Sequence, residues 1–189
     1  MLPGYLVNKG CGRNYGLEFT FEKFFSNTYF LMFTASLYDS RYKGSDGIER
    51  NTTFNGHYAL NALGEKEFSL SKNHHSMLTT GFKITRDGGQ RYTPVDTAAS
   101  RIAGEIVEID SKRNTLQFKD YFRLDLKIGI KLNRKNITHE FAFDLVNVLN
   151  TKNILAMTYV YDPMHPNVDP VQKEYQLGLL PIFYYKIDF

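Results

Sequence analysis

Two sets of residues in this sequence have types that could form a catalytic or metal site. Asp39 and Ser40 are adjacent and His57 lies on a later segment, so the three could be imagined as a hydrolytic triad. Nothing in the local sequence positions a serine nucleophile, so hydrolysis is not predicted. His74 and His75 are adjacent and lack spaced partners, which favours a solvated turn over a metal site. We therefore expect no catalytic residue, no metal site and no cofactor.

Two Arg-Tyr pairs are candidates for ligand binding: Arg41 with Tyr42, and Arg91 with Tyr92. Each pair combines a guanidinium group, which donates several hydrogen bonds, with an aromatic ring on which a ligand can stack. The same residues would serve equally well to pack one loop against another, and this alternative stays open. Either role requires elements that bring the two pairs to the same part of the molecule.

The elements are predicted to be β-strands. Seven segments alternate apolar and polar residues with a period of two, which indicates strands with one apolar and one polar side. A helical pattern is present only weakly, around 97–108. The chain is therefore predicted to be all-β, with about seven meander strands at 15–22, 29–37, 54–70, 78–85, 122–132, 140–145 and 183–189.

The connections between these segments alternate in length. Alternate connections of a meander lie at the same end of the sheet, so the long ones share one rim. Short periplasmic turns and long extracellular loops are typical of transmembrane β-barrels, whereas soluble sandwiches and lipocalin-like barrels follow no such rule. The short turns are predicted at 25–28, 71–74 and 133–136, and the long loops at 39–52, 86–119 and 150–176.

The last segment ends in Phe189, with Ile187 and Tyr185 on the same side of the strand. Terminal residues of soluble proteins usually fray in water. In an outer-membrane barrel, a terminal aromatic lies in the interfacial girdle, and the last strand is a signal to the barrel-assembly machinery. Phe189, Ile187 and Tyr185 are therefore predicted to form an assembly signal at the periplasmic end.

If the chain crosses a membrane, its composition favours strands over helices as the crossing elements. The chain has 15 Phe and 13 Tyr but no Trp, and it contains no run of about 20 apolar residues. A net charge of +3 with scattered basic residues gives no indication of a nucleic-acid partner. The single Cys11 cannot form an internal disulfide, and Met1–Gly4 does not open a signal peptide.

Short motifs follow one another along nearly the whole chain. They are RNYGLE at 13–18, DSRYKG at 39–44, NTTFNG at 51–56, RYTP at 91–94, DYFRLD at 120–125, DLVNVLN at 144–150 and YKIDF at 185–189. In this order, the set resembles the C-terminal barrel of TonB-dependent outer-membrane receptors, particularly those of the Bacteroidota type. The segment 144–150 resembles the D-x-x-N-x-x-N ending of the penultimate strand in that family.

The resemblance implies a 22-stranded barrel plugged by an N-terminal domain. Such receptors import iron chelates, vitamins, glycans or peptides, with energy from the TonB complex acting on the plug. The implied partners are outer-membrane lipid, the barrel-assembly machinery, the TonB complex through the plug region, and a nutrient ligand. Because extracellular loops and strand tops contact the substrate in the family, the resemblance favours Arg41, Tyr42, Arg91 and Tyr92 as ligand contacts.

The sequence has no counterpart of the plug, the TonB box or a signal peptide. Bacterial single-chain barrels close with an even number of strands, so residues 1–189 are interpreted as an open C-terminal fragment without catalytic activity, located in a Gram-negative outer membrane. Two alternatives remain. A small complete outer-membrane barrel, either a porin or an enzyme, would need an eighth strand, for which 153–161 is the candidate. A soluble lipid-binding barrel would bury the apolar side.

Overall fold

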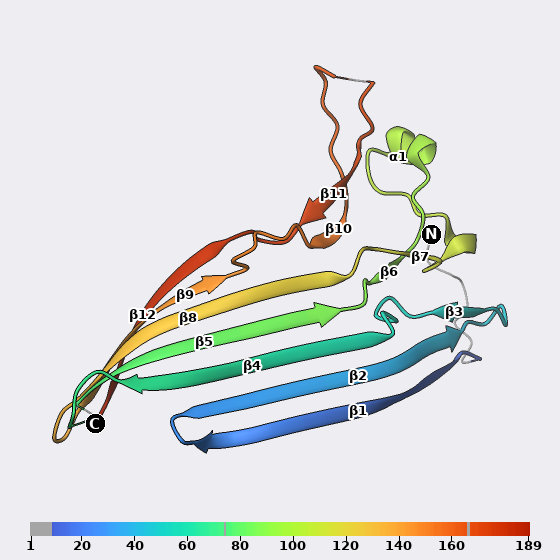
Figure 1. The fold of residues 1–189 in the computed structure, drawn as a ribbon. Coiled ribbons are helices and arrows are strands. Elements are labelled where there is room, and N and C mark those ends of the chain that lie inside the picture. The colour runs from blue at the N-terminus through green and yellow to red at the C-terminus, as the bar shows by residue number, and fades with distance from the viewer. Residues whose placement is uncertain (1–8, 74, 166) are drawn as a thin grey trace.

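The computed structural model describes residues 9–73, 75–165 and 167–189. Its main feature is one curved antiparallel sheet, seen in Figure 1 as a single layer of long strands. Seven strands are neighbours in the order β1-β2-β4-β5-β8-β9-β12. The all-β prediction is confirmed, and each strand overlaps one predicted segment: β1 (Cys11–Ser26), β2 (Tyr29–Lys43), β4 (Tyr58–Ser69), β5 (Ser76–Asp87), β8 (Tyr121–Asn133), β9 (Thr138–Val146) and β12 (Leu180–Asp188).

Smaller elements lie within the long connections. β3 (Glu49–Asn51) pairs with β2, β6 (Arg91–Tyr92) with β7 (Leu116–Gln117), and β10 (Ile154–Tyr159) with β11 (Val171–Tyr175). The weak helical pattern is confirmed over helix α1 (Thr97–Ala103), and a 3-10 turn, η1, follows at Asp110–Lys112. Asp96 caps α1 by accepting a hydrogen bond from the Ala99 amide, and Gly104 ends it in a left-handed conformation.

The connections separate into two ends, as predicted. The short turns between β1 and β2, between β4 and β5, and between β8 and β9 lie at one end with the C-terminus, here called the short-turn end, on the left of Figure 1. The connections 44–57, 88–120 and 147–179 lie at the opposite end, here called the long-loop end. The sheet therefore presents all its long connections on one rim.

Two predicted boundaries at the long-loop end are wrong. The first long loop does not begin at Asp39, because β2 continues to Lys43 in pairing with β1, whose strand begins at Cys11. The next strand does not begin at Phe54, because residues 52–57 form turns before β4 starts. His57 has a φ of 74°, a left-handed conformation that interrupts an extended strand.

Each face of the sheet carries one kind of side chain across neighbouring strands. On the face here called the apolar face, Phe21, Phe33, Ala62, Ile84 and Leu124 lie directly across from one another in the register. Large side chains on this face are exposed, including Leu17 at 79% and Ile128 at 50%. A whole face of unpartnered apolar side chains exceeds what a soluble monomer normally exposes.

The opposite face, here called the polar face, has charged side chains that pair with one another. Lys127 lies 3.1 Å from a Glu65 oxygen and 3.3 Å from a Glu140 oxygen, and Lys131 lies 2.5 Å from Glu67. The Tyr184 hydroxyl donates to Glu140 at 2.9 Å. Glu140 is 7% exposed, so this ladder across β4, β8, β9 and β12 lies largely away from solvent.

The register steps steadily along the sheet. The row that starts at Tyr29, the first residue of β2, passes through Lys66, Thr80, Ile128 and Phe143 to Phe183 on β12. Phe183 lies five residues before Asp188, the last residue of β12 (188 − 183 = 5). Five strand-to-strand steps separate β2 from β12, so the short-turn ends shift by about one residue per strand. Such a stagger accompanies strands that tilt around a barrel axis.

The sheet is open. Among the described residues, β1 and β12 each pair with one neighbour in the main sheet and not with each other. The candidate eighth strand at 153–161 does form, as β10, but its place is wrong for closure: it pairs with β11 in a separate two-stranded sheet. The described residues contain no helix of the length and apolar character needed to cross a membrane.

The DLVNVLN segment forms the exit from β9. Asn147 and Asn150 both adopt left-handed conformations, with φ of 54° and 51°. The buried Asn147 amide donates to the Thr151 and Leu177 carbonyls, and Asn150 accepts a hydrogen bond from the Leu179 amide. These contacts bring the chain that leaves β9 beside the chain that enters β12, so the two asparagines close the base of the 147–179 connection.

Candidate functional site

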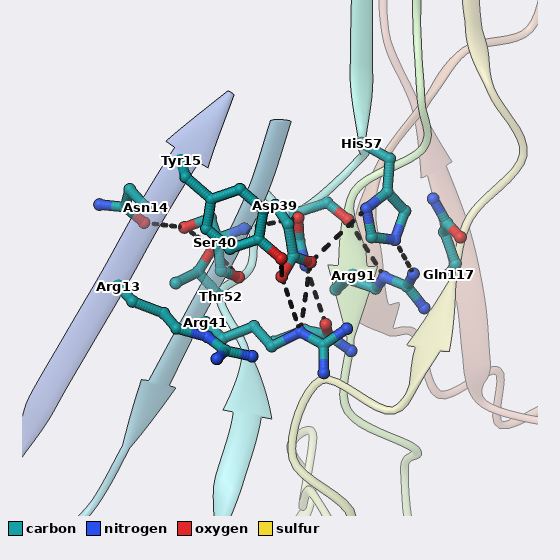
Figure 2. A network of polar contacts seen from close by, with 12 residues as sticks. Arg13, Asn14, Tyr15, Asp39, Ser40, Arg41, Thr52, His57, Arg91 and Gln117 are labelled. Carbon is teal, nitrogen blue, oxygen red and sulfur yellow. Dashed lines mark hydrogen bonds and ion pairs between the residues drawn. The ribbon is translucent and has the colours of Figure 1, made fainter. Parts of the chain in front are cut away.

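A network of polar side chains lies at the long-loop end of β1 and β2 (Figure 2). At its centre, the Asp39 carboxylate accepts hydrogen bonds from the Tyr15 hydroxyl at 3.1 Å and the Asn55 amide at 2.9 Å. The Arg41 guanidinium pairs with the same carboxylate at 3.0 Å. Asp39 is only 9% exposed, so three donors compensate for the removal of this charge from water.

Asn55 connects this network to the first long loop. Its side chain is fully buried, and its oxygen accepts a hydrogen bond from the Ser40 amide at 2.9 Å. Its nitrogen donates to Asp39 and to Asn51, each at 2.9 Å. Since one side chain bonds to groups on both β2 and β3, Asn55 holds the 44–57 connection against the long-loop end of β2.

Arg91 joins the second long loop to the first. Its Nε donates to the Asn55 carbonyl at 3.2 Å, and one of its terminal nitrogens lies 2.9 Å from His57 Nε2. The Arg91 amide donates to the Thr53 carbonyl at 2.8 Å. Because Arg91 comes from the 88–120 connection and its partners from 44–57, these contacts fasten the two loops together.

Two glycines lie where these loops pass each other. A Cβ atom on Gly88 would lie 1.7 Å from the Gly56 carbonyl oxygen, and a Cβ on Gly56 would lie 2.3 Å from the Gly88 oxygen. Only residues without a side chain permit backbones to approach this closely. The loop crossing therefore depends on glycine at both positions.

A hollow of about 640 Å³, here called the rim hollow, lies between the three long connections. The 44–57 and 88–120 connections contribute Thr52, Tyr92 and Asn114, and β10 of the third contributes Met157. The Tyr92 ring is stacked on Phe118 with their centroids 4.1 Å apart. Asn114 donates to the Asn51 carbonyl at 2.8 Å, so the wall of the hollow is tied to β3. The hollow combines aromatic, aliphatic and charged groups, as small-molecule sites do.

The structure brings together three of the four residues predicted to contact a ligand. Tyr42, Arg91 and Tyr92 line the rim hollow. Arg41 is not among the lining residues; its guanidinium pairs with Asp39 and, at 3.4 Å, with Glu49. Arg41 and Tyr42 were expected in the first long loop, which is wrong because they lie at the end of β2. Arg91 and Tyr92 lie in the long 88–120 connection, as expected, and form β6 there.

The triad residues do not form a nucleophile with its base. The Ser40 hydroxyl donates to Asn14 at 2.6 Å and accepts from Thr52 at 2.9 Å. His57 Nε2 faces Arg91, and its Nδ1 lies 3.8 Å from Asp39. The described residues contain no group of three or more His, Cys, Asp or Glu side chains placed to hold a metal ion. His74 lies outside the described residues.

The tip of the first long loop is held by an ion pair. Arg50 lies 2.6 Å from Asp46, and the Ile48 amide donates to the same carboxylate at 3.0 Å. The hydrogen bond from Arg50 lowers the pKa of Asp46 to about 2. At the base of the second loop, the hydrogen bond from the Tyr58 hydroxyl lowers the pKa of Asp120. Both carboxylates are therefore charged at neutral pH and hold their loops through that charge.

The proposed assembly residues lie on the apolar face of β12. The Tyr185 ring is stacked on Phe141 at 4.8 Å, and its hydroxyl lies 2.8 Å from His139 Nδ1. Ile187 lies across from His139 in the register. Phe189 follows the last paired residue and is 92% exposed.

Sequence reasoning considered Asp39 only as a possible triad residue and did not identify Asn55 or Asn114 as parts of the site. The signal available was the segment from 51 to 56, which contains two asparagines, the second directly before a glycine. Comparison of the chain with protein-family models, with curated proteins and with solved structures finds no match.

Proposed function

We propose that the chain is the C-terminal part of an outer-membrane receptor barrel of the TonB-dependent type, which takes up a nutrient bound at the long-loop rim. The observation that carries this proposal is the contrast between the two faces of the sheet. Apolar side chains are exposed on one face, whereas on the other face the lysines of β8 and the glutamates of β4 and β9 are paired and partly buried. A wall between lipid and a wet lumen needs this arrangement.

The crowding of the polar face supports this orientation over a soluble lipid-binding barrel. Side chains on the inside of a curved sheet approach one another, whereas those on the outside spread apart. Thr79 and Ala142 on the polar face are 0% and 7% exposed, while Phe141 and Ile130 on the apolar face are 51% and 43% exposed. A lipid-binding barrel would have the opposite distribution, with its apolar side chains crowded inside.

The register and the edges support an incomplete barrel. The stagger of about one residue per strand provides the tilt that closure requires. Six antiparallel steps separate β1 from β12, so these two edge strands run in the same direction. An all-antiparallel closed barrel therefore needs an odd number of further strands between them. Direct pairing of β1 with β12, in one copy or between copies, would be parallel.

The proposal is tested by placing a charge on each face. In the protein expressed from its complete gene and folded into lipid vesicles, Leu126→Arg on the apolar face should lower the free energy of unfolding by about 2–4 kcal/mol, the cost near a bilayer midplane. Thr34→Arg, on the polar face of β2, is the matched control and should change it by less than about 1 kcal/mol. Denaturant titration measures both variants.

Extraction behaviour provides the second arm of this test. Membranes washed with alkaline carbonate should retain the protein, and detergent should release it. A protein recovered in the soluble fraction, with both arginine variants equally stable, would contradict the membrane proposal and favour the soluble lipid-binding barrel.

A further inference from the structure

A second hollow, of about 520 Å³, lies on the polar face beneath the long loops and is here called the inner recess. Its floor is formed by residues of β4, β5 and β8, and its upper edge by the 88–120 connection. Gln90 and Phe118 line both the inner recess and the rim hollow. The two hollows are therefore adjacent and share a wall, which the Tyr92 ring supports by stacking on Phe118.

Positive charge exceeds negative charge in the inner recess. Lys83, Lys119 and Arg123 line it, against one carboxylate, that of Asp87. The Arg123 guanidinium is neutralised by Asp125 at 3.0 Å. Among the described residues, the ammonium groups of Lys83 and Lys119 have no ion pair or hydrogen bond. Two lysines therefore remain available to a ligand.

The carboxylate nearest to Lys83 in the register is already engaged. Asp125 lies directly across from Lys83 on β8. Its carboxylate binds Arg123 and also accepts a hydrogen bond from the backbone N–H of Asn147 at 2.9 Å. Lys83 is thus left without a partner although an acidic residue is its neighbour. By contrast, Lys127 and Lys131, which lie on β8 nearer the short-turn end, each pair with glutamates of β4.

We propose that the inner recess binds the anionic part of a ligand, a carboxylate or phosphate group, by the ammonium groups of Lys83 and Lys119. The proposal rests on the function proposed above, which directs the polar face toward the lumen. A ligand that has passed the rim hollow would then reach the inner recess. The Tyr38 and Tyr121 hydroxyls also line the recess and can donate to the same group. Lysine acts as a point charge toward such anions.

The first experiment measures binding of small anions by calorimetry at constant ionic strength. The probes are pyrophosphate and citrate, with trehalose as a neutral control. The protein should bind at least one anion saturably and should not bind trehalose. Lys83→Gln and Lys119→Gln should each weaken anion binding about tenfold or more, the usual effect of losing a charged hydrogen bond. Lys135→Gln, in the exposed turn at the short-turn end, is the matched control and should leave binding unchanged.

The second experiment does not require a variant to fold. Acetylation of lysines in the unmutated protein, followed by mass spectrometry, should show that the bound anion protects Lys83 and Lys119 and leaves Lys135 reactive.

A further variant, Asp87→Asn, should tighten anion binding, because it removes the one opposing charge in the recess. Binding of neither anion, equal loss in all three glutamine variants, or protection of Lys135 alone would overturn the proposal. The proposed membrane location is decided separately, by extraction.

Discussion

At the long-loop end of the sheet, buried amide and carboxylate groups hold the loops to one another, whereas at the short-turn end aromatic rings pack between neighbouring strands. Asn55 is fully buried and has three hydrogen-bond partners there. At the other end, Tyr185 stacks on Phe141 and Phe189 is exposed. A directional polar network specifies one loop arrangement, while apolar packing tolerates several. The contrast fits the proposed function, in which the long-loop rim binds a ligand and the aromatic rings of the short-turn end lie at the membrane interface.

The largest difference between the two ends is expected when one side-chain amide is removed from each and the loss of stability is compared. Asn55→Ala removes three hydrogen bonds, leaves the Ser40 amide without its acceptor and reduces the donors to the Asp39 carboxylate from three to two. We expect a loss of about 2–4 kcal/mol in the free energy of unfolding. Asn136→Ala, in an exposed short turn, should cost less than about 0.5 kcal/mol. Denaturant titration gives both values, and equal costs would show that the long-loop end has no special dependence on buried amides.

Removal of Phe189 tests the role assigned to the short-turn end. In the protein expressed from its complete gene, the deletion should lower the amount in the outer membrane several-fold, because the interfacial aromatic and the end of the last strand are lost. Anion affinity of the inserted fraction should be unchanged, since the inner recess lies at the opposite end. Quantitative blotting and calorimetry measure the two outcomes, with Phe189→Tyr as control. Normal levels with weaker binding would reverse the assignment of the ends.

A smaller effect is expected from the stacked rings that each end contains. Double-mutant cycles with Leu replacements should give a coupling of about 0.5–1.5 kcal/mol for Tyr92 with Phe118, and a similar value for Phe141 with Tyr185. Hydrogen exchange distinguishes the pairs. Tyr92→Leu should speed exchange across residues 88–120, because that ring supports the wall between the two hollows. Tyr185→Leu should speed hydrogen exchange only in the neighbouring residues of β9.

The smallest expected effect is a local loss of stability at the tip of the first long loop at acidic pH. The pKa of Asp46 is about 2 in the folded protein, below the value of an unpaired carboxyl, so its pairing with Arg50 stabilises the loop tip above about pH 4. This contribution is lost as the pH falls through about 2. The protection factors of the amides of residues 46–50 against hydrogen exchange should therefore fall between pH 4 and pH 2, and Asp46→Asn should abolish that dependence. The turn 134–137 has no carboxylate and should not respond; an equal response there would indicate general unfolding.

The sequence was sufficient to predict the seven long strands, because each alternates apolar and polar residues over many positions. The alternation of short and long connections followed directly from their spacing. The short strands β3, β6, β7 and β11 were not predicted, since two to five residues are too few to show a period. Their pairing is set by tertiary contacts, such as the hydrogen bond from Asn114 to the Asn51 carbonyl.

The candidate site was predicted only in outline. Arg91 and Tyr92 could be proposed because their side chains are of types that bind ligands. That Asn55 is buried, or that Lys83 lacks a partner, depends on which strands lie beside them. Lys83 and Lys127 both lie on the polar side of an alternating segment. Lys127 pairs with Glu65, whereas Lys83 lies across from Asp125, whose carboxylate already pairs with Arg123. Such differences arise only when the register is known.

The close contact of Gly56 with Gly88 also bears on how this rim can change during evolution. Any side chain at either position would collide with the other backbone, so the crossing cannot be altered without moving both loops. Beyond it, the exposed residues around Gly104 and Glu105 lie far along the 88–120 connection and can accept insertions or new residues. The Gly56–Gly88 crossing is thus constrained, whereas the loop tips beyond it can vary in length and sequence without disturbing the sheet.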